Sequence, residues 1–389
     1  MPRLVLLTPA ELTRDPRARR AALAAIDAGW QVTGVCAAAG GPPTGLAGVG
    51  IVRVGGERLD SVLRAAGLGG GRRDHAVLRE LRGVYRVLRL ARLTVELFRA
   101  GRKVGEATVV HANDFDTLPA AYLLAQSLGA RLVYDAHELY TLQEADPPRV
   151  HLAIVRLFER ALARRADAVV TVNELIATEL RDLLGLGEQP FVVLNCPART
   201  AATSVSSTHR PLRAVYQGAV GHGRSLDDLL DAAACLDGVA LTLRVAGLDA
   251  DTLRTEVGRR GLAGGITVVE PVDPADLVDA LTEFDVGLIV TRPLTRNDEL
   301  AAPNKLFEYL MAGLAVAVPR LPGVAAIVEA EQVGIMFEPG SPTALAAALS
   351  ELARRPDEVS RCKQRAREVA VTRFNAESQR PALAAAWGA

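Results

Sequence analysis

The spacing of apolar residues divides the chain into two successive series of short strands and amphipathic helices. In each series, short and almost wholly apolar runs alternate with segments in which apolar residues recur at the spacing of a helix. Strands that are apolar on both faces and separated by helices are typical of a parallel sheet covered on both sides. The expected strands are residues 3–7, 30–36, 108–114, 131–138, 167–172 and 191–194 in the first series, and 214–218, 241–247, 266–270, 285–290 and 315–319 in the second.

The segment between the two series lacks periodic apolar positions. Residues 196–211 are rich in Ser, Thr, Ala and Pro, which is typical of a linker. We therefore expect an α/β protein with two doubly wound domains, residues 1–195 and 212–370, followed by a C-terminal segment, residues 371–389. Open parallel sheets bind ligands at the carboxyl ends of their strands, so we expect the site in a cleft between the two domains.

Composition narrows the class of protein. The 389 residues include 45 Lys and Arg and 45 Asp and Glu, and a formal net charge of zero argues against a nucleic-acid-binding protein. No uncharged apolar run reaches the length of a membrane span, and the N-terminus is charged too early for a signal peptide. The 4 cysteines are too scattered for a zinc or disulfide framework. We expect a cytoplasmic protein, and its Arg and Ala content indicates a GC-rich, bacterial genome.

The segment around Asn304 is the most informative for chemistry. Asn304 suits the cap of a helix that stops at Gly313, and a helix N-terminus attracts phosphate through free N–H groups and the helix dipole. Lys305 would add a full positive charge to that turn. Glu308 would lie on the same side and could accept hydrogen bonds from two hydroxyl groups, as a ribose offers. A buried helix with a capped start and a Lys–Glu pair is the alternative interpretation.

A glycine-rich loop lies between the strand at residues 214–218 and the next expected helix. Gly218 and Gly223 would let the backbone approach a ligand, and Arg224 offers a planar fork of donors for phosphate oxygens. The loop is neither a Walker motif nor a GxGxxG motif, so a glycine-rich turn without a ligand is the alternative interpretation.

Two expected strands of the first series end in polar residues. One strand end carries His111, Asn113 and Asp114, and the end of the next carries Asp135, His137 and Glu138. A single buried histidine is often structural, but two strand ends that each carry a His and an acid favour general acid–base work or hydroxyl recognition. Their spacing does not indicate a metal site.

Taken together, these motifs resemble the GT-B glycosyltransferases, and within them the retaining family known as glycosyltransferase family 4. The resemblance covers most of the chain and is carried, in order, by HANDFDTLPAAYLLAQSLGARLVYDAHELY, VVTVNELIATEL with VVLNCP, VYQGAVGHGRSLDDLLDA and PNKLFEYLMAGLAVAVP. It implies two Rossmann-like domains that face each other across a cleft, with a closing helix in residues 371–389 that crosses back to the first domain. It also implies transfer of a sugar from a nucleoside-diphosphate donor to an acceptor hydroxyl, with retention of configuration and without a metal or other cofactor.

The resemblance assigns roles to residues at matching positions. It implies that Arg224 holds the diphosphate, that Glu308 grips the donor ribose and that His137 contacts the donor sugar near the reaction centre, which makes these three the expected catalytic residues. The implied donor-binding set is Gly218, Gly223, Arg224, Asn304, Lys305 and Glu308. The implied acceptor-side set is Arg17, His111, Asp114 and Glu138.

The chain departs from the family's pattern in three places. Leu300 stands where the family often has a second Glu, and Ala219 stands where it usually has an Arg. The usual glycine-rich loop after the first strand is replaced by TPAELTRDPRARR, which leaves Asp15, Arg17 and Arg20 as candidate acceptor contacts. A non-catalytic nucleotide-sugar-binding or assembly subunit therefore remains an alternative, as does an NDP-sugar epimerase of the same architecture. The absence of a GxGxxG turn argues against an NAD enzyme.

The stretch from Arg72 to Lys103 is strongly basic. It has ten basic and three acidic residues, and both Arg and Leu recur in it at helical spacing. This pattern is typical of a basic amphipathic helix that could lie on the anionic inner face of a membrane. An Arg-rich solvated surface on an ordinary packed helix is the other interpretation.

Overall fold

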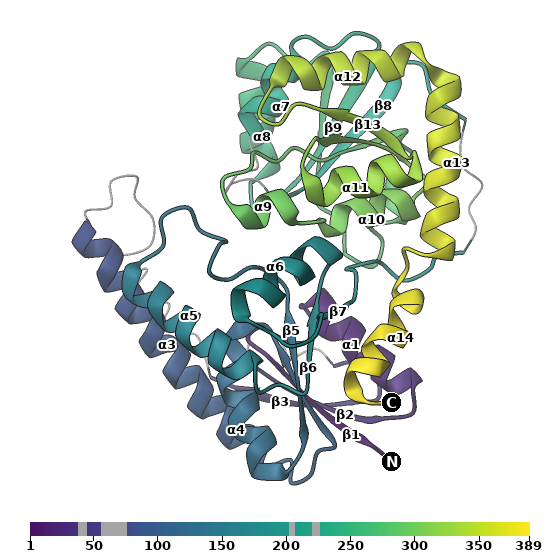
Figure 1. Ribbon diagram of the computed structural model, residues 1–389. Coiled ribbons are helices and arrows are strands. Elements are labelled where there is room, and N and C mark those ends of the chain that lie inside the picture. Colours follow the sequence, from purple (N-terminus) through teal and green to yellow (C-terminus); the bar gives the residue numbers. More distant parts are fainter. Residues whose placement is uncertain (38–44, 56–75, 202–206, 220–225) are drawn as a thin grey trace. The chain divides into compact units, whose positions relative to one another are not determined.

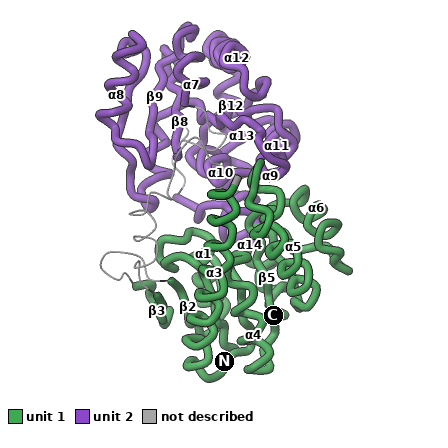
Figure 2. Tube along the Cα trace, turned by 90° about the vertical axis from the view of Figure 1, so that its left-hand side faces the viewer, with its two compact units in different colours: residues 1–193, 380–389 green, residues 194–379 purple. Residues whose placement is uncertain are grey.

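The computed structural model describes residues 1–37, 45–55, 76–201, 207–219 and 226–389. These residues form two compact units, Met1–Val193 with Arg380–Ala389, and Leu194–Gln379 (Figure 2). Each unit contains one sheet, and all the strand pairs described in it are parallel. Helices pack against each sheet (Figure 1). The expected α/β class with two Rossmann-like, doubly wound domains is therefore confirmed.

The first unit is built on a sheet in the strand order β3-β2-β1-β4-β5-β6-β7. The order reverses between β1 and β4, which is the point where open parallel sheets form a crevice for ligands. Its strands are β1 (Arg3–Thr8), β2 (Gln31–Ala37), β3 (Val49–Val54), β4 (Val109–Asn113), β5 (Arg131–Ala136), β6 (Ala168–Thr171) and β7 (Phe191–Val192). Its helices are α1 (Pro16–Asp27), α3 (Ala76–Arg102), the short η1 (Phe115–Thr117), α4 (Leu118–Leu128), α5 (Arg149–Ala163) and α6 (Glu174–Leu184).

The second unit repeats this plan with the strand order β10-β9-β8-β11-β12-β13 and a reversal between β8 and β11. Its strands are β8 (Leu212–Ala219), β9 (Val239–Ala246), β10 (Ile266–Val269), β11 (Val286–Leu288), β12 (Ala315–Pro319) and β13 (Gly334–Phe337). Its helices are α7 (Leu226–Ala233), α8 (Ala250–Arg259), the short η2 (Asp279–Leu281), α9 (Arg296–Leu300), α10 (Asn304–Met311), α11 (Pro322–Glu331), α12 (Pro342–Arg354) and α13 (Pro356–Thr372). Neither these nor the other described helices have the length and apolar composition needed to cross a membrane.

Local capping explains where the helices next to the first sheet begin and end. The Asp15 side chain accepts hydrogen bonds from the backbone N–H groups of Arg17 and Ala18 and so begins α1. The same carboxylate accepts hydrogen bonds from the Thr8 hydroxyl, at 3.0 Å, and from the Asn113 amide, at 2.8 Å. Because Thr8 ends β1 and Asn113 ends β4, a single cap fixes the start of α1 against the crevice of the sheet.

Several elements were missed by the apolar pattern, among them the strands β3 and β13 and the helix α5. β13 lies where only helices were expected, because it is short and only partly buried. Gly334 brings it so close to β12 that a side-chain carbon would collide with the Val316 carbonyl oxygen. α5 was also not expected, although its residues in the strip facing the sheet, Val155, Glu159 and Ala163, are buried. Glu159 interrupts the apolar strip and so hides it from sequence.

The chain passes from the first unit to the second at Leu194 and returns at Arg380. Cys196, at the start of the expected linker, is fully buried in the core of the second unit, and residues 202–206 of that linker lie outside the described residues. The last helix, α14 (Ala376–Trp387), ends in the core of the first unit, where the Trp387 and Trp30 rings lie 5.7 Å apart.

Removing the Tyr309 hydroxyl should destabilise the second unit. This buried hydroxyl accepts a hydrogen bond from the Gln217 backbone N–H, at 3.0 Å, and donates one to the Leu288 carbonyl, at 3.1 Å. Tyr309→Phe leaves both backbone groups without this partner, so we expect the free energy of unfolding to fall by about 1–3 kcal/mol. Urea denaturation measures the change. Tyr122→Phe, for which no side-chain hydrogen bond is described, is the control; equal losses in both variants would contradict the assignment.

Candidate functional site

The carboxyl ends of β4 and β5 bring the predicted residues of the first unit together. Asn113 and Asp135 are register partners in the parallel pair, so Asp114 and His137 follow from neighbouring strand ends. Asp114 has φ 85°, a conformation that residues with side chains rarely adopt. Its carboxylate accepts a hydrogen bond from the Phe115 N–H at 3.1 Å and caps η1. Unusual backbone of this kind is concentrated at functional sites.

His137 lies between two carboxylates. Its Nδ1 is 3.9 Å from Asp114 Oδ2 and its Nε2 is 3.7 Å from Asp135 Oδ2. Burial disfavours the charged imidazole, but the attraction of Asp135 and Asp114 outweighs it and raises the pKa of His137. The imidazolium form is thereby favoured at this end of the sheet, as a donor of hydrogen bonds rather than an acceptor of protons.

Asp135 is held by Arg17 from α1. The two side chains form a bidentate ion pair, with Nε to Oδ2 at 2.8 Å and Nη2 to Oδ1 at 2.6 Å, and both are buried. Arg17 Nη1 also donates to the Val193 carbonyl at 2.7 Å. Burial alone would raise the pKa of Asp135, but Arg17 and His137 hold it well below its ordinary value. Asp135 therefore stays ionised and faces His137 as an anion.

His111 lies on the other side of the same carboxylate. The Trp387 indole N–H donates to His111 Nδ1 at 3.2 Å, and because an indole can only donate, Nδ1 must be the acceptor. The ring proton is therefore on Nε2, which lies 3.5 Å from Asp135 Oδ2. The closing helix thus reaches the site network through one side chain.

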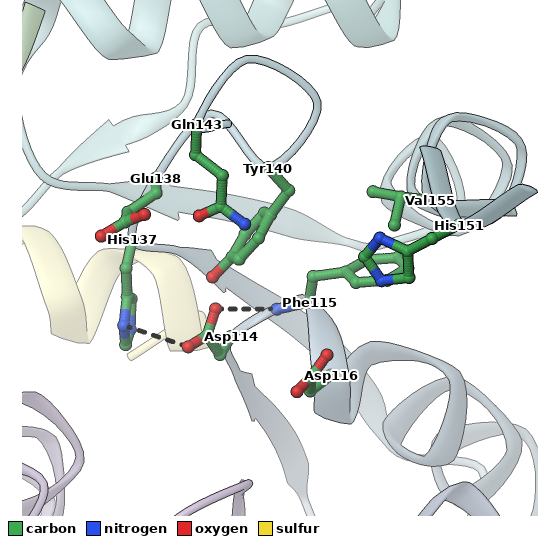
Figure 3. A pocket seen from close by; sticks show the side chains of 9 residues that line it. All are labelled: Asp114, Phe115, Asp116, His137, Glu138, Tyr140, Gln143, His151 and Val155. Atoms are coloured by element: carbon green, nitrogen blue, oxygen red, sulfur yellow. Dashed lines mark hydrogen bonds and ion pairs between the residues drawn. The ribbon is translucent and has the colours of Figure 1, made fainter. Parts of the chain in front are cut away.

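A cavity of about 290 Å³ opens beside these strand ends (Figure 3). His137, Asp114 and Glu138, three of the predicted site residues, line it. Arg17 and His111, which were expected to contact an acceptor, are instead buried behind it in the Asp135 network. Its remaining lining residues are Phe115, Asp116, Tyr140, Gln143, His151 and Val155.

Several of these lining residues were missed by sequence reasoning. His151 and Val155 come from α5, which the apolar pattern did not predict. The Phe115 and Tyr140 rings lie 5.7 Å apart and give the cavity an apolar wall between its carboxylates. Aromatic rings beside acceptors and donors of hydrogen bonds suit a polyhydroxylated ligand. Among the described residues, no group of three or more His, Cys, Asp or Glu side chains is placed to hold a metal ion.

In the second unit, the end of β8 lies against the start of α10. Gly218 has φ 128°, and a side-chain carbon there would come within 2.8 Å of Lys305 Nζ. The Lys305 ammonium lies 4.5 Å from the centre of the Tyr216 ring, a cation–π contact that fixes its direction. Gly218 and Lys305, both predicted donor-binding residues, are thus brought together.

Glu308, one turn further along α10, is linked to the sheet through Gln217. The Gln217 amide donates to Glu308 Oε2 at 3.3 Å, and Arg244 Nη1 donates to Gln217 Oε1 at 3.4 Å. Arg244 is buried, and burial lowers its pKa. Neither Gln217 nor Arg244 was singled out from sequence, because each lies on a strand whose residues otherwise look like ordinary sheet positions.

The cap expected of Asn304 is not formed. Pro303 occupies the N-cap position of α10 and Asn304 is the first helical residue, so no side chain caps the helix. Proline fixes the backbone before the first turn and thereby displaces Asn304 by one position. Within the first turn, the Leu306 N–H donates to the Pro303 carbonyl at 3.0 Å. Two further predicted residues, Gly223 and Arg224, lie outside the described residues.

The departures from the expected pattern have structural counterparts. Leu300 is buried at the end of α9, and its carbonyl lies so close to Gly323 of α11 that a side-chain carbon there would collide with it. The neighbouring Glu299 is bound to Arg296 at 2.8 Å. At position 300, where the family often has an acid, this chain therefore has a buried leucine side chain.

Two protein-family models match the chain, and together they cover most of it. Residues 15–197 match the model described as "Glycosyl transferase 4-like domain", and residues 212–355 match the one described as "Glycosyl transferases group 1". The comparison with curated proteins gave no match.

Solved structures match over the whole length at low sequence identity. Sucrose-phosphate synthase from Thermosynechococcus elongatus has a TM-score of 0.73 at 15% identity, covering 100% of this chain and 98% of that chain. HepE from Anabaena, in complex with UDP and glucose, has a TM-score of 0.66 at 14% identity, covering 100% of both chains. The trehalose 6-phosphate synthase from Burkholderia multivorans has a TM-score of 0.68 at 13% identity, covering 100% and 98%. At these identities the likeness establishes a shared fold.

Replacing Asp114 with Asn tests how much the buried carboxylate lowers the free energy of unfolding. Burial raises the pKa of this group from 3.8 to about 7, against an opposing effect of His137. Between pH 4 and pH 7 the Asp114 carboxyl is protonated in the native state and ionised in the unfolded chain. The contribution of Asp114 to the free energy of unfolding is therefore fully present below about pH 4, and it is lost as the pH rises through about 7. We expect Asp114→Asn to raise the free energy of unfolding at pH 8 by up to about 4 kcal/mol and to leave it unchanged near pH 4.

Thermal melts of both proteins between pH 4 and pH 8 measure this difference. Asp182→Asn, on an exposed stretch of α6, is the control, because water already solvates its carboxylate. A constant difference between Asp114→Asn and the parent at all pH values would show that the effect is not one of charge.

Proposed function

Because the chain belongs to the GT-B glycosyltransferases of the family 4 type, we propose that it transfers a sugar from a nucleoside-diphosphate donor to an acceptor hydroxyl, with retention of configuration and without a metal ion. The observation that carries this proposal is that each unit has polar groups at the reversal point of its sheet. In the first unit Asp114 follows β4, which borders that point, and His137 lies beside it after β5. In the second unit Lys305 lies against the end of β8, and Glu308 lies one turn further along α10. The proposed enzyme works in the cytoplasm.

The donor is assigned to the second unit. Glu308, oriented by Gln217, is suited to accept hydrogen bonds from ribose hydroxyls, and Lys305 with the uncapped start of α10 is suited to a diphosphate. Arg224 has the matching position for a second cation. Because HepE of Anabaena has been solved with UDP and with UDP-glucose, uridine donors are the first to test.

Metal independence follows if the protein supplies the positive charge that the leaving diphosphate needs. Preorganised cations and N–H groups are effective at such a site because they do not reorganise during the reaction. Lys305 is held in place by the Tyr216 ring, and Gly218 allows the backbone to pass beside it. In this proposal the leaving phosphate accepts the acceptor's proton on the same face, and the configuration is retained.

The acceptor is assigned to the cavity of the first unit. Asp114 and Glu138 provide oxygen acceptors for hydroxyl groups, and the Phe115 and Tyr140 rings provide an apolar wall. His137, favoured in its charged form, is suited to donate a hydrogen bond to an oxygen of the donor sugar.

Loss of the Glu308 carboxylate should abolish donor binding. We expect UDP in large excess to raise the melting temperature of the protein by several degrees, since a ligand at 100 times its Kd adds about 2.7 kcal/mol. Glu308→Ala should remove this protection. Glu299→Ala, which breaks only the surface pair with Arg296, should retain it. Protection of Glu308→Ala equal to that of the parent would reject the role of Glu308, and a parallel series with GDP, ADP and dTDP identifies the base.

Product analysis tests the reaction itself. Purified protein is incubated with UDP-glucose and a panel of hydroxyl acceptors, with and without EDTA. We expect a glycoside with the anomeric configuration of the donor, seen by NMR, and less than a twofold loss of rate in EDTA. An inverted product or a rate abolished by EDTA would contradict the proposal. Binding of donors without any product would favour a non-catalytic subunit, and donor conversion without acceptor would favour an epimerase.

A further inference from the structure

The outer face of α3 carries a row of exposed apolar side chains. Val77, Leu81, Val84, Leu88 and Val95 are 70%, 56%, 43%, 63% and 44% exposed. Their spacing of three, four and seven residues places them on one side of the helix, within a narrow stripe. A helix packed on a globular protein normally turns such a stripe inward, whereas here the stripe faces away from the unit.

α5 packs beside α3 and shows the same feature. A side-chain carbon at Gly83 of α3 would come within 2.6 Å of Pro148, just before α5, so the two helices approach closely (Figure 1). Val150, Leu157 and Phe158 of α5 are 43%, 64% and 42% exposed. Of the thirteen large hydrophobic side chains exposed in the described chain, eight lie on these two helices. Exposed apolar side chains gathered in this way mark an interaction surface.

The positive charges near these exposed apolar side chains indicate an anionic partner. α3 and α5 contain ten arginines and three glutamates, although the whole chain has a net charge of zero. One of the glutamates, Glu159, is buried and its pKa is raised to about 8. Arg92 and Arg99 follow Leu88 and Val95 by one helical turn, so they lie beside the α3 stripe, and both are exposed. Arg92 forms a surface ion pair with Glu96, of the kind that contributes little to stability and can be exchanged for another anion.

We propose that the outer faces of α3 and α5 dock on an anionic lipid bilayer. Leu81, Leu88 and Leu157 enter the boundary between headgroups and acyl chains, and the arginines beside them bind lipid phosphates. An apolar stripe bordered by arginines is the arrangement by which an amphipathic helix lies in the plane of a membrane. A protein partner of opposite charge would need no row of leucines, and a second copy of this surface would bring like charges together.

The same helices connect this surface to the site. The inner side of α5 places His151 and Val155 on the wall of the cavity, and Arg89 lies 3.5 Å from Asp116 of that wall. Docking would therefore bring the cavity to within about one helix diameter, roughly 10 Å, of the bilayer. This proposal concerns lipid binding alone and stands whether or not the protein transfers a sugar.

Sedimentation with vesicles tests the proposal on the full chain. The protein is mixed with vesicles of phosphatidylcholine containing about one third phosphatidylglycerol, and with vesicles of phosphatidylcholine alone. We expect binding to the anionic vesicles, weaker binding to the neutral ones, and a loss of binding as salt is raised. Absence of binding to anionic vesicles at low salt would overturn the proposal.

Two double variants distinguish lipid binding through this surface from nonspecific hydrophobic adsorption. Leu81→Ser with Leu88→Ser should lower the partition coefficient roughly tenfold or more, because two buried leucines are lost from the lipid. Leu175→Ser with Leu183→Ser, on the exposed side of α6, should leave it unchanged. Equal partition of both variants would overturn the proposal. So would a concentration-dependent dimer, seen by size-exclusion chromatography, that the α3 variant abolishes.

Arg92→Glu with Arg99→Glu keeps the apolar stripe and reverses the charge at its border. We expect this variant to lose its preference for anionic vesicles while its melting temperature stays within a few degrees of the parent, since surface pairs of this kind contribute little. A preserved preference would show that these arginines do not contact the lipid and would overturn the assignment of the border.

Discussion

The buried ion pair between Arg17 and Asp135 is the interaction on which the site of the first unit depends. A buried pair of charges is stable only when both partners are well placed and further hydrogen bonded. Here the pair is bidentate, and Arg17 also donates to the Val193 carbonyl. It therefore joins the start of α1, the end of β5 and the last residue of the first segment of the unit, and it leaves one face of the Asp135 carboxylate turned to the histidines.

The rest of the site follows from the charge of that carboxylate. Because Asp135 stays ionised, His137 is drawn toward the charged form, and Asp114 on its other side accepts an unfavourable backbone conformation to complete the arrangement. The second unit orients its polar groups through other contacts. There Lys305 is directed by the Tyr216 ring, and Glu308 accepts a hydrogen bond from the neutral Gln217 amide.

The helices α3 and α5, which pack beside the first sheet, each have an inner face that packs on the unit and an outer face with exposed apolar side chains. α5 presents His151 and Val155 to the cavity and turns Leu157 outward, while α3 packs through its glycines and exposes Leu81 and Leu88. Arginines border the outer faces of both helices. The catalytic proposal and the lipid proposal thus use opposite sides of the same packed layer, which explains why these helices look unlike the Ala-rich α1 and α4.

The sequence alone determined the class of fold and the strand ends that carry the polar residues of the cavity. Apolar strands, helix-stopping glycines and the residues at positions 111–114 and 135–138 are local signals, because backbone preference and burial act over a few neighbours. Only the tertiary structure decided which polar residues face a cavity. Arg17 and His111 are as polar as His137, yet partners 118 and 276 residues away draw them into the interior. Pairing over such distances depends on how whole elements pack, and no local pattern encodes it.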